Sequence, residues 1–320
     1  MSKFEAFNVS TATYKTVGDH PVLADIFLPK DLAAGTHPLI LRFHGGALVN
    51  GSRNAELFFP TWLLEYAVAK SAILISADYR MMPESSGLDI LEDVDDFWKW
   101  LFTGLPLQLQ TITSGQSAAD FTRILAFGES AGGYLATLLA FAHPKEIRVL
   151  VASYASLDIH GMLAQWLNHG YPTLPFPDGI VPVGLVTSHI ASMKPGEVVS
   201  NSQFPGPRTP LAFGLMQQGR YLEYLGDDPR LFPFQRLELE KAQGATAWPR
   251  TVLIHGVDDD SVPIEGSRAF KAKLEETKPD SRVFMVEQPG SHFFDCQMHL
   301  EEAETWLPMK FIGKNWLLYR

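Results

Sequence analysis

The apolar residues of this chain fall into two kinds of stretch that alternate along its length. Short continuous apolar runs are typical of strands buried on both faces of a sheet, and apolar residues three or four positions apart indicate helices with one buried face. The predicted strands are 14–17, 22–28, 38–43, 72–77, 123–127, 148–153, 251–255 and 282–286, and the predicted helices are 57–70, 88–101, 134–140, 265–276 and 298–307. Because strand and helix alternate, we predict an α/β fold with a mostly parallel central sheet flanked by helices.

The pattern changes between residues 154 and 248. Proline and glycine are frequent there, and apolar residues such as Trp166, Tyr171 and Phe204 follow no clear period. The segment is too rich in aromatic residues for a solvated linker. We therefore expect an inserted cap, or lid, over the strand ends where such folds bind ligands, with residues 1–153 and 249–320 forming the core. The alternative is a structural side domain.

One short motif lies between the predicted strand 123–127 and the helix that follows it. Its sequence is Gly128-Glu129-Ser130-Ala131-Gly132, and a G-x-S-x-G pattern between strand and helix is typical of a nucleophile elbow. We expect a side chain at either glycine to collide with the neighbouring strand or helix. The turn would then expose the Ser130 hydroxyl beside a helix N-terminus, which favours negative charge. A plain Gly/Ser turn is the alternative reading of the motif alone.

A serine hydroxyl becomes a strong nucleophile only beside a base, and that base needs a third group to orient it. Three aspartates at 258–260 and His292 follow Ser130 in the order serine, acid, histidine. The acids and His292 each come just after a predicted strand, so all three groups should meet at one edge of the sheet.

The acid and the histidine must each be chosen among several candidates. Asp259 is favoured because it precedes Pro263 by four positions, in a D-x-x-V-P pattern, with Asp260 as the next choice. His292 is favoured because it lies in the loop after the last strand, whereas His299 falls within the predicted final helix. The remaining histidines precede the acid, so they do not fit the order of such a triad.

An acyl-transfer site also needs backbone N–H groups aimed at the developing oxyanion. Ala131, directly after the candidate nucleophile, supplies one such group. The loop His44-Gly45-Gly46-Ala47 follows a predicted buried strand, and its small residues allow two more amides to approach a substrate closely.

Three motifs of the chain resemble those of the hormone-sensitive-lipase-like branch of the α/β-hydrolase carboxylesterases. The segments 44–47, 78–84 and 128–133 read HGGA, DYRMMPE and GESAGG, and they resemble that family's H-G-G-G, D-Y-R-L-A-P-E and G-D-S-A-G-G. The resemblance implies the α/β-hydrolase fold. It also implies structural roles for Asp78 and Arg80, which would brace the sheet.

The same resemblance assigns supporting roles around the serine. It implies that Gly46, Ala47 and Ala131 carry the oxyanion-binding amides, that Gly45 shapes the turn beside the substrate, and that Glu129 is a supporting acid. Ala47 replaces the third glycine of H-G-G-G, so we expect a narrower space there and tighter selection of the acyl group. The N-terminus is short, so the cap should come mostly from the insertion.

Composition excludes several other classes of protein. The net charge of −10 argues against nucleic acid and anionic membranes as main partners. We predict neither a signal peptide nor an integral membrane segment. The single cysteine, Cys296, cannot form an internal disulfide and fits a cytoplasmic location. The sequence contains neither a metal-ligand cluster nor a phosphate-binding glycine loop, so we expect no metal and no cofactor.

We therefore expect a serine hydrolase that cleaves a small or medium apolar ester through an acyl-enzyme intermediate. A thioesterase, lactonase, acyltransferase or dehydratase acting on a specialised metabolite would use the same residues. A non-catalytic small-molecule receptor would be expected to lack a triad residue, and nothing resembles the accessory domains of a peptidase. The natural substrate, the acyl chain length and the oligomeric state stay open.

Overall fold

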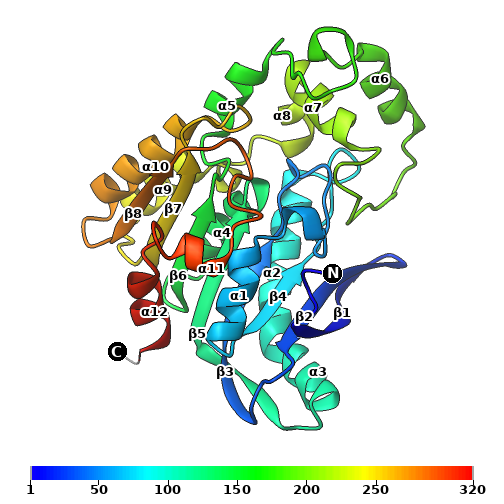
Figure 1. Cartoon of the computed structure of the whole chain (residues 1–320). Helices are drawn as coiled ribbons and strands as arrows, with labels where there is room; N and C mark the ends of the chain where they lie inside the picture. Colours follow the sequence, from blue (N-terminus) through cyan, green and yellow to red (C-terminus); the bar gives the residue numbers. More distant parts are fainter. Residues whose placement is uncertain (1, 319–320) are drawn as a thin grey trace.

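The computed structural model describes residues 2–318, and their strands form one twisted sheet (Figure 1). The strand order is β1-β2-β4-β3-β5-β6-β7-β8, in which β1 pairs with β2 and β2 with β4 in antiparallel fashion and all other neighbours are parallel. The strands are β1 (Phe7–Val17), β2 (His20–Pro29), β3 (Gly35–Phe43), β4 (Ile73–Ala77), β5 (Ser117–Glu129), β6 (Ile147–Ser153), β7 (Arg250–Gly256) and β8 (Val283–Gln288). The predicted α/β fold with a mostly parallel sheet is confirmed.

Helices cover both faces of the sheet and enclose two separate apolar cores. On one face, α1 (Thr61–Ala69), the short α11 (Leu300–Ala303) and α12 (Met309–Leu317) bury residues such as Trp62 and Trp316. On the other face lie α2 (Gly87–Thr103), α3 (Leu105–Ile112), α4 (Ala131–Ala142) and α10 (Ile264–Thr277). The apolar side of α2, with Phe97 and Leu101, packs into this second core, as its amphipathic pattern predicts.

Several boundaries differ from the sequence prediction. The strand β1 begins at Phe7 rather than at residue 14, because its polar, β-branched first half pairs with β2 along the full hairpin. The helix predicted at 298–307 is reduced to α11, and α3 and α12 are additional helices. A short 3-10 turn at Glu56–Phe58 precedes α1, so the helix predicted from residue 57 begins at Thr61.

A long segment, residues 154–249, separates β6 from β7 and is here called the β6–β7 insertion. Its helices are α5 (Ile159–Trp166), α6 (Val183–Ser192), α7 (Thr209–Gln217), α8 (Tyr221–Leu225) and α9 (Pro233–Ala242), with 3-10 turns at Pro177–Gly179 and Pro229–Leu231. Helices α5 to α8 gather at one end of the sheet, whereas α9 returns to pack against α4 and α10 (Figure 1). The insertion is therefore divided between one end of the sheet, where α5 to α8 lie, and the helices on one face of the sheet, where α9 lies.

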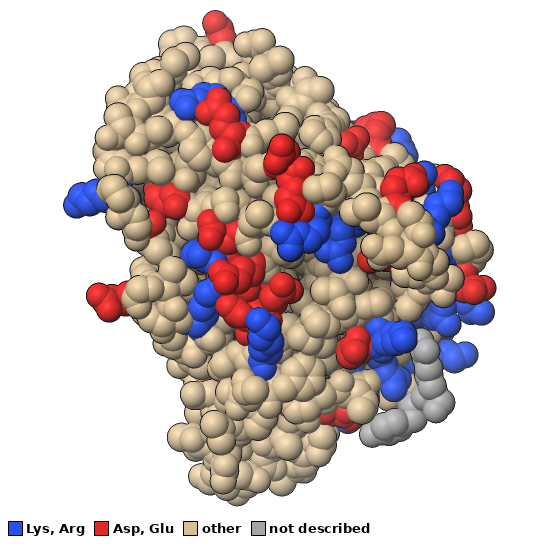
Figure 2. Space-filling view, turned by 180° about the vertical axis from the view of Figure 1, so that it is seen from behind, with Lys and Arg blue, Asp and Glu red and all other residues tan. Residues whose placement is uncertain are grey.

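The surface shows charges of both signs. On the face drawn in Figure 2, acidic and basic side chains are interspersed, without a broad patch of either sign. Among residues 2–318, no helix combines the length and the apolar character needed to cross a bilayer.

Candidate active site

The turn at Ser130 is as tight as its motif predicts. The strand β5 ends at Glu129 and α4 begins at Ala131, so Ser130 alone joins them, with φ 55° and ψ −122°. A non-glycine residue with such a φ is strained by about 1–3 kcal/mol, and such strain is typical of functional turns. The Ser130 N–H donates to the Ser153 carbonyl of β6 at 2.9 Å, which helps hold the turn in place.

The glycines on either side of the serine have no room for a side chain. A Cβ at Gly128 would lie 2.1 Å from the Gly132 carbonyl oxygen, and one at Gly132 would lie 2.0 Å from the Phe43 carbonyl oxygen of β3. The first contact is with the following helix and the second with the neighbouring strand. The predicted collision is therefore confirmed at both positions.

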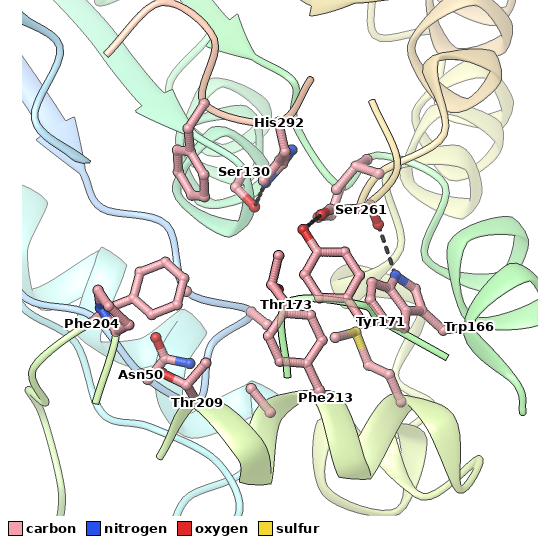
Figure 3. A pocket seen from close by; sticks show the side chains of 18 of the residues that line it. Asn50, Ser130, Trp166, Tyr171, Thr173, Phe204, Thr209, Phe213, Ser261 and His292 are labelled. Carbon is pink, nitrogen blue, oxygen red and sulfur yellow. Dashed lines mark hydrogen bonds between the residues drawn. The ribbon is translucent and has the colours of Figure 1, made fainter. Parts of the chain in front are cut away.

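The loops after β5, β7 and β8 bring three polar side chains into one hydrogen-bonded chain. His292 Nε2 lies 3.0 Å from Ser130 Oγ, and His292 Nδ1 lies 2.7 Å from Asp259 Oδ2. Figure 3 shows the His292 ring beside the Ser130 hydroxyl at the wall of a cavity. The three residues chosen from the sequence therefore meet at one edge of the sheet.

The surroundings of Asp259 keep its carboxyl ionised. Its Oδ1 accepts the N–H groups of Ser261 and Val262, each at 2.9 Å, and His255 Nε2 lies 3.3 Å from Oδ2. Burial favours the neutral carboxyl, but the charge of His292 and these hydrogen bonds outweigh burial and hold the pKa of Asp259 well below its usual range. A carboxylate held in this way can orient the imidazole and stabilise its protonated form.

The other candidates for the acid and the histidine form hydrogen bonds with groups outside this chain of three residues. Asp258 Oδ2 accepts the Gly290 N–H at 3.1 Å, and Asp260 Oδ1 accepts the Ser261 hydroxyl at 3.2 Å. His299 lies directly before α11, not inside a helix, and its Nδ1 is 2.6 Å from Glu65.

The loop after β3 contains three consecutive residues with positive φ angles. Gly46, Ala47 and Leu48 have φ of 118°, 55° and 58°, and a Cβ at Gly46 would lie 1.9 Å from the Asn50 carbonyl oxygen. None of the backbone hydrogen bonds outside regular elements in residues 2–318 uses the N–H of Gly46, Ala47 or Ala131 as a donor. These three N–H groups are available for a ligand.

Two predicted site residues, Gly45 and Glu129, do not line the cavity beside Ser130. Glu129 is fully buried and forms an ion pair with Arg42. Burial raises the pKa of Glu129 to about 7 against the opposing charge of Arg42. Gly45 and Glu129 instead support the loops that carry the lining residues.

The other motif residues are structural. The buried Asp78 carboxylate accepts hydrogen bonds from the Arg53 backbone and side chain, and Arg80 pairs with Asp93 of α2. This agrees with the bracing roles that the resemblance implies. The His44 ring stacks on Tyr79 at 4.4 Å, and burial lowers its pKa to about 3, so it is neutral.

A cavity of about 480 Å³ opens beside Ser130 and His292, and most of its wall is apolar. The β6–β7 insertion contributes more than half of the lining residues, including Trp166, Tyr171 and Phe204. The lining residues are Gly46, Ala47, Asn50, Phe58, Ser130, Ser156, Met162, Trp166, Tyr171, Thr173, Leu174, Phe204, Pro205, Thr209, Ala212, Phe213, Met216, Tyr221, Ser261, Val262, His292 and Phe293. Sequence reasoning missed Asn50 and Tyr221, because neither stands in a motif. Within residues 2–318, no group of three or more His, Cys, Asp or Glu side chains is placed to hold a metal ion.

Comparisons with known proteins identify the family of the chain. The alpha/beta hydrolase fold family matches residues 40–171. The chain is 32% identical to probable carboxylesterase M8 of Phoma sp., over 98% of each chain. It is also 26% identical to the non-reducing polyketide synthase Preu6 of Preussia isomera, over 92% of this chain but 14% of that protein.

The fold is also that of known esterase structures. Esterase 2 of Thermogutta terrifontis, in its form phosphonylated by sarin, superposes with a TM-score of 0.61 at 17% identity, over 99% of this chain and 98% of that chain. At this identity the likeness concerns the fold. Together with the match to a probable carboxylesterase over 98% of each chain, it places the chain in the α/β-hydrolase fold family, as a carboxylesterase-like hydrolase.

Proposed function

We propose that the protein hydrolyses carboxylic esters through an acyl-enzyme, with Ser130 as nucleophile, His292 as general base and Asp259 as the group that orients His292. The observation that carries this proposal is the continuous hydrogen-bonded chain from Asp259 through His292 to Ser130. Each member is held by its own loop after a strand, so the geometry is fixed before substrate binds.

In the first step, Ser130 Oγ attacks the ester carbonyl carbon while His292 Nε2 accepts the hydroxyl proton. The Asp259 carboxylate stabilises the imidazolium that forms. The carbonyl oxygen becomes an oxyanion, which the N–H groups of Gly46, Ala47 and Ala131 bind. Removal of one such donor typically costs about 2.7–4 kcal/mol of transition-state stabilisation.

In the second half, the ester C–O bond breaks and the alcohol leaves with the proton that His292 donates. Water then attacks the acyl-enzyme, and His292 accepts a proton from that water. Collapse of the second tetrahedral intermediate releases the carboxylic acid and returns the proton to Ser130. The residues of the chain supply every proton transfer in this sequence.

The β6–β7 insertion closes the cavity, so it limits the size of the substrate. We propose that residues 154–248 act as a cap on a core formed by residues 1–153 and 249–320, although α9 packs with the core helices. Its aromatic residues close a cavity of about 480 Å³, which suits a small or medium apolar ester rather than nucleic acid. The buried lone Cys296 is compatible with the cytoplasmic location that we propose.

A second candidate function is cleavage or transfer of an acyl group held as a thioester. It is favoured by the similarity to a segment of a polyketide synthase. Ser130, His292 and the oxyanion-binding amides would act in the same way, because only the leaving atom changes from oxygen to sulfur.

The test is hydrolysis of 4-nitrophenyl esters from acetate to decanoate, beside N-acetylcysteamine thioesters of the same acids, by wild type and Ser130→Ala. We expect turnover of the oxygen esters, with an optimum at short or medium chains and a loss of at least about a thousandfold in Ser130→Ala. A clear preference for thioesters would favour the second candidate. Retained turnover in Ser130→Ala would contradict both.

A further inference from the structure

Asn50 presents an unused polar group at the wall of the cavity. Its side chain lines the same cavity as Ser130, and the residue is only 1% exposed. Its Oδ1 is buried against the backbone of Gly46, and neither Oδ1 nor Nδ2 forms a hydrogen bond within residues 2–318, so the Nδ2 donor is unused. Buried side-chain amides are normally hydrogen-bonded, because an unpaired one loses its interaction with water without replacement.

The backbone around Asn50 is held without help from this side chain. The Asn50 N–H donates to Gly46 O at 3.0 Å, the Val49 carbonyl accepts Arg208 Nε at 2.7 Å, and the Leu48 carbonyl accepts an N–H at 2.8 Å. The loop is therefore already fixed by its main chain. The Asn50 amide contributes no hydrogen bond to that arrangement, so a structural role for its polarity is not evident from the contacts.

The position of Asn50 in the cavity is defined by its neighbours. In Figure 3, Asn50 and Phe204 lie on one side of Ser130, and Tyr171 and Ser261 lie on the other. The wall on the Asn50 side is largely aromatic, because Phe204 stacks on Phe58 with ring centroids 4.5 Å apart. A polar amide in an apolar wall is the arrangement by which ligand pockets fix the orientation of a bound molecule.

From these contacts we propose that Asn50 is a specificity-determining residue, whose Nδ2–H donates a hydrogen bond to an oxygen atom of the substrate near the scissile ester group. The preferred substrate class is then an apolar ester that carries an ether, hydroxyl or carbonyl oxygen in the part lying against Phe58 and Phe204. This inference rests on the proposed function, since it places the ester carbonyl at Ser130.

The physical basis is the cost of leaving the amide unpaired. An ester that lacks the oxygen fills the same space but buries the Asn50 amide against carbon. A site built to hydrogen-bond a ligand atom discriminates strongly against the analogue without it, for this reason. Asn50 forms no hydrogen bond with Asp259, His292 or Ser130, so its effect should appear as selectivity among substrates.

The test compares isosteric esters that differ by one oxygen. For the acyl side, 4-nitrophenyl 3-methoxypropanoate is compared with the pentanoate, and for the alcohol side, 2-methoxyethyl butanoate is compared with butyl butanoate. The quantity is the ratio of kcat/KM within each pair, measured for wild type, Asn50→Leu and Asn50→Asp. Intrinsic reactivity cancels when this ratio is compared between variants.

We expect the ratio to favour the ether in one pair and to fall about tenfold in Asn50→Leu. Asn50→Asp, which keeps the size of the side chain, should lose the same preference because a carboxylate cannot donate to an ether oxygen. Asn54→Leu is the matched control: it makes the same substitution at an exposed position of the same loop, outside the cavity, and should keep the wild-type ratios. Equal ratios in wild type, Asn50→Leu and Asn50→Asp for both pairs would overturn the inference.

A binding measurement separates this inference from the proposed function. Calorimetry with Ser130→Ala and with Ser130→Ala/Asn50→Leu gives the dissociation constants of the same esters without turnover. Tighter ether binding that depends on Asn50 would support the inference even if wild type hydrolysed none of the esters, an outcome that contradicts the proposed function alone. Equal binding by the two variants would overturn the inference.

Discussion

His292 and Asp259 are joined by a hydrogen bond of 2.7 Å, although the two residues stand in loops after different strands. The neighbouring carboxylates at 258 and 260 accept their hydrogen bonds from Gly290 and Ser261 instead. Only one of three consecutive aspartates is therefore placed to orient the imidazole.

This relationship predicts a sharp contrast among three substitutions. Asp259→Asn should lower kcat by about 10³- to 10⁴-fold, because an amide cannot stabilise the imidazolium as a carboxylate does. Asp258→Asn and Asp260→Asn are the matched controls and should change kcat by only a few fold. Steady-state kinetics on one 4-nitrophenyl ester measures all three. A loss in Asp260→Asn as large as that in Asp259→Asn would show that the acid is misassigned.

The buried pair of Glu129 and Arg42 predicts a pH dependence of stability. The pKa of Glu129 is raised from 4.5 to about 7, so the folded chain holds this proton more tightly than the unfolded chain does. The free energy of unfolding should therefore fall, by at most about 3 kcal/mol, as the pH rises from about 4.5 to about 7, and should then level off.

The measurement is urea unfolding at several pH values for wild type and Glu129→Gln. Asp78, whose pKa is raised to about 6, contributes in the same direction but is common to both proteins. The difference between the two proteins isolates Glu129. Parallel pH profiles for wild type and Glu129→Gln would contradict the prediction.

Arg208 connects the β6–β7 insertion to the loops that follow β3 and β4. Its guanidinium donates to the Val49 and Met82 carbonyls and pairs with Glu84, whose side chain is 3% exposed. Arg208→Met would leave a buried carboxylate largely unpaired, so we expect a loss of about 3–5 kcal/mol in the free energy of unfolding and a raised KM.

The control for this substitution is Arg220→Met in the same insertion. Arg220 pairs with the half-exposed Glu223, and such surface pairs contribute about 0–1 kcal/mol. Chemical denaturation measures the free energy of unfolding of both variants, and steady-state kinetics measures their KM. Equal destabilisation by the two substitutions would mean that Arg208 does not anchor the insertion.

Ala47 stands where the similar family motif has glycine, so the substitution Ala47→Gly tests what its methyl group does. Its φ of 55° suits glycine, so Ala47→Gly should change the free energy of unfolding by no more than about 1 kcal/mol. Loss of the methyl group widens the space beside the amides that we propose bind the oxyanion. The kcat/KM for 4-nitrophenyl 2,2-dimethylpropanoate, divided by that for 4-nitrophenyl acetate, should therefore rise several-fold. An unchanged ratio would show that Ala47 does not limit the acyl group.

The sequence predicted the parts of this molecule that local patterns determine. The turn at Ser130 is specified by two glycines whose Cβ positions are occupied by backbone, and Asp259 and His292 are selected by their order after predicted strands. The sheet followed from apolar runs in the same way. These signals are carried by residues close together in the chain.

The rest depends on contacts between residues far apart in the chain. The first half of β1 has no apolar run and becomes a strand only by pairing with β2. Asn50 has no motif of its own, and the role that we propose for it depends on a cavity closed by residues of the insertion more than a hundred positions later. The partner of Glu129, Arg42, likewise lies on another strand.

The central claim is that Ser130 is the nucleophile activated by His292. The most direct test is covalent labelling with a 4-nitrophenyl alkylphosphonate, followed by intact-protein and peptide mass spectrometry. We predict a single phosphonyl adduct on Ser130, absent from Ser130→Ala and formed at least about a hundredfold more slowly in His292→Ala. An adduct at another residue, or undiminished labelling of Ser130→Ala, would contradict the account.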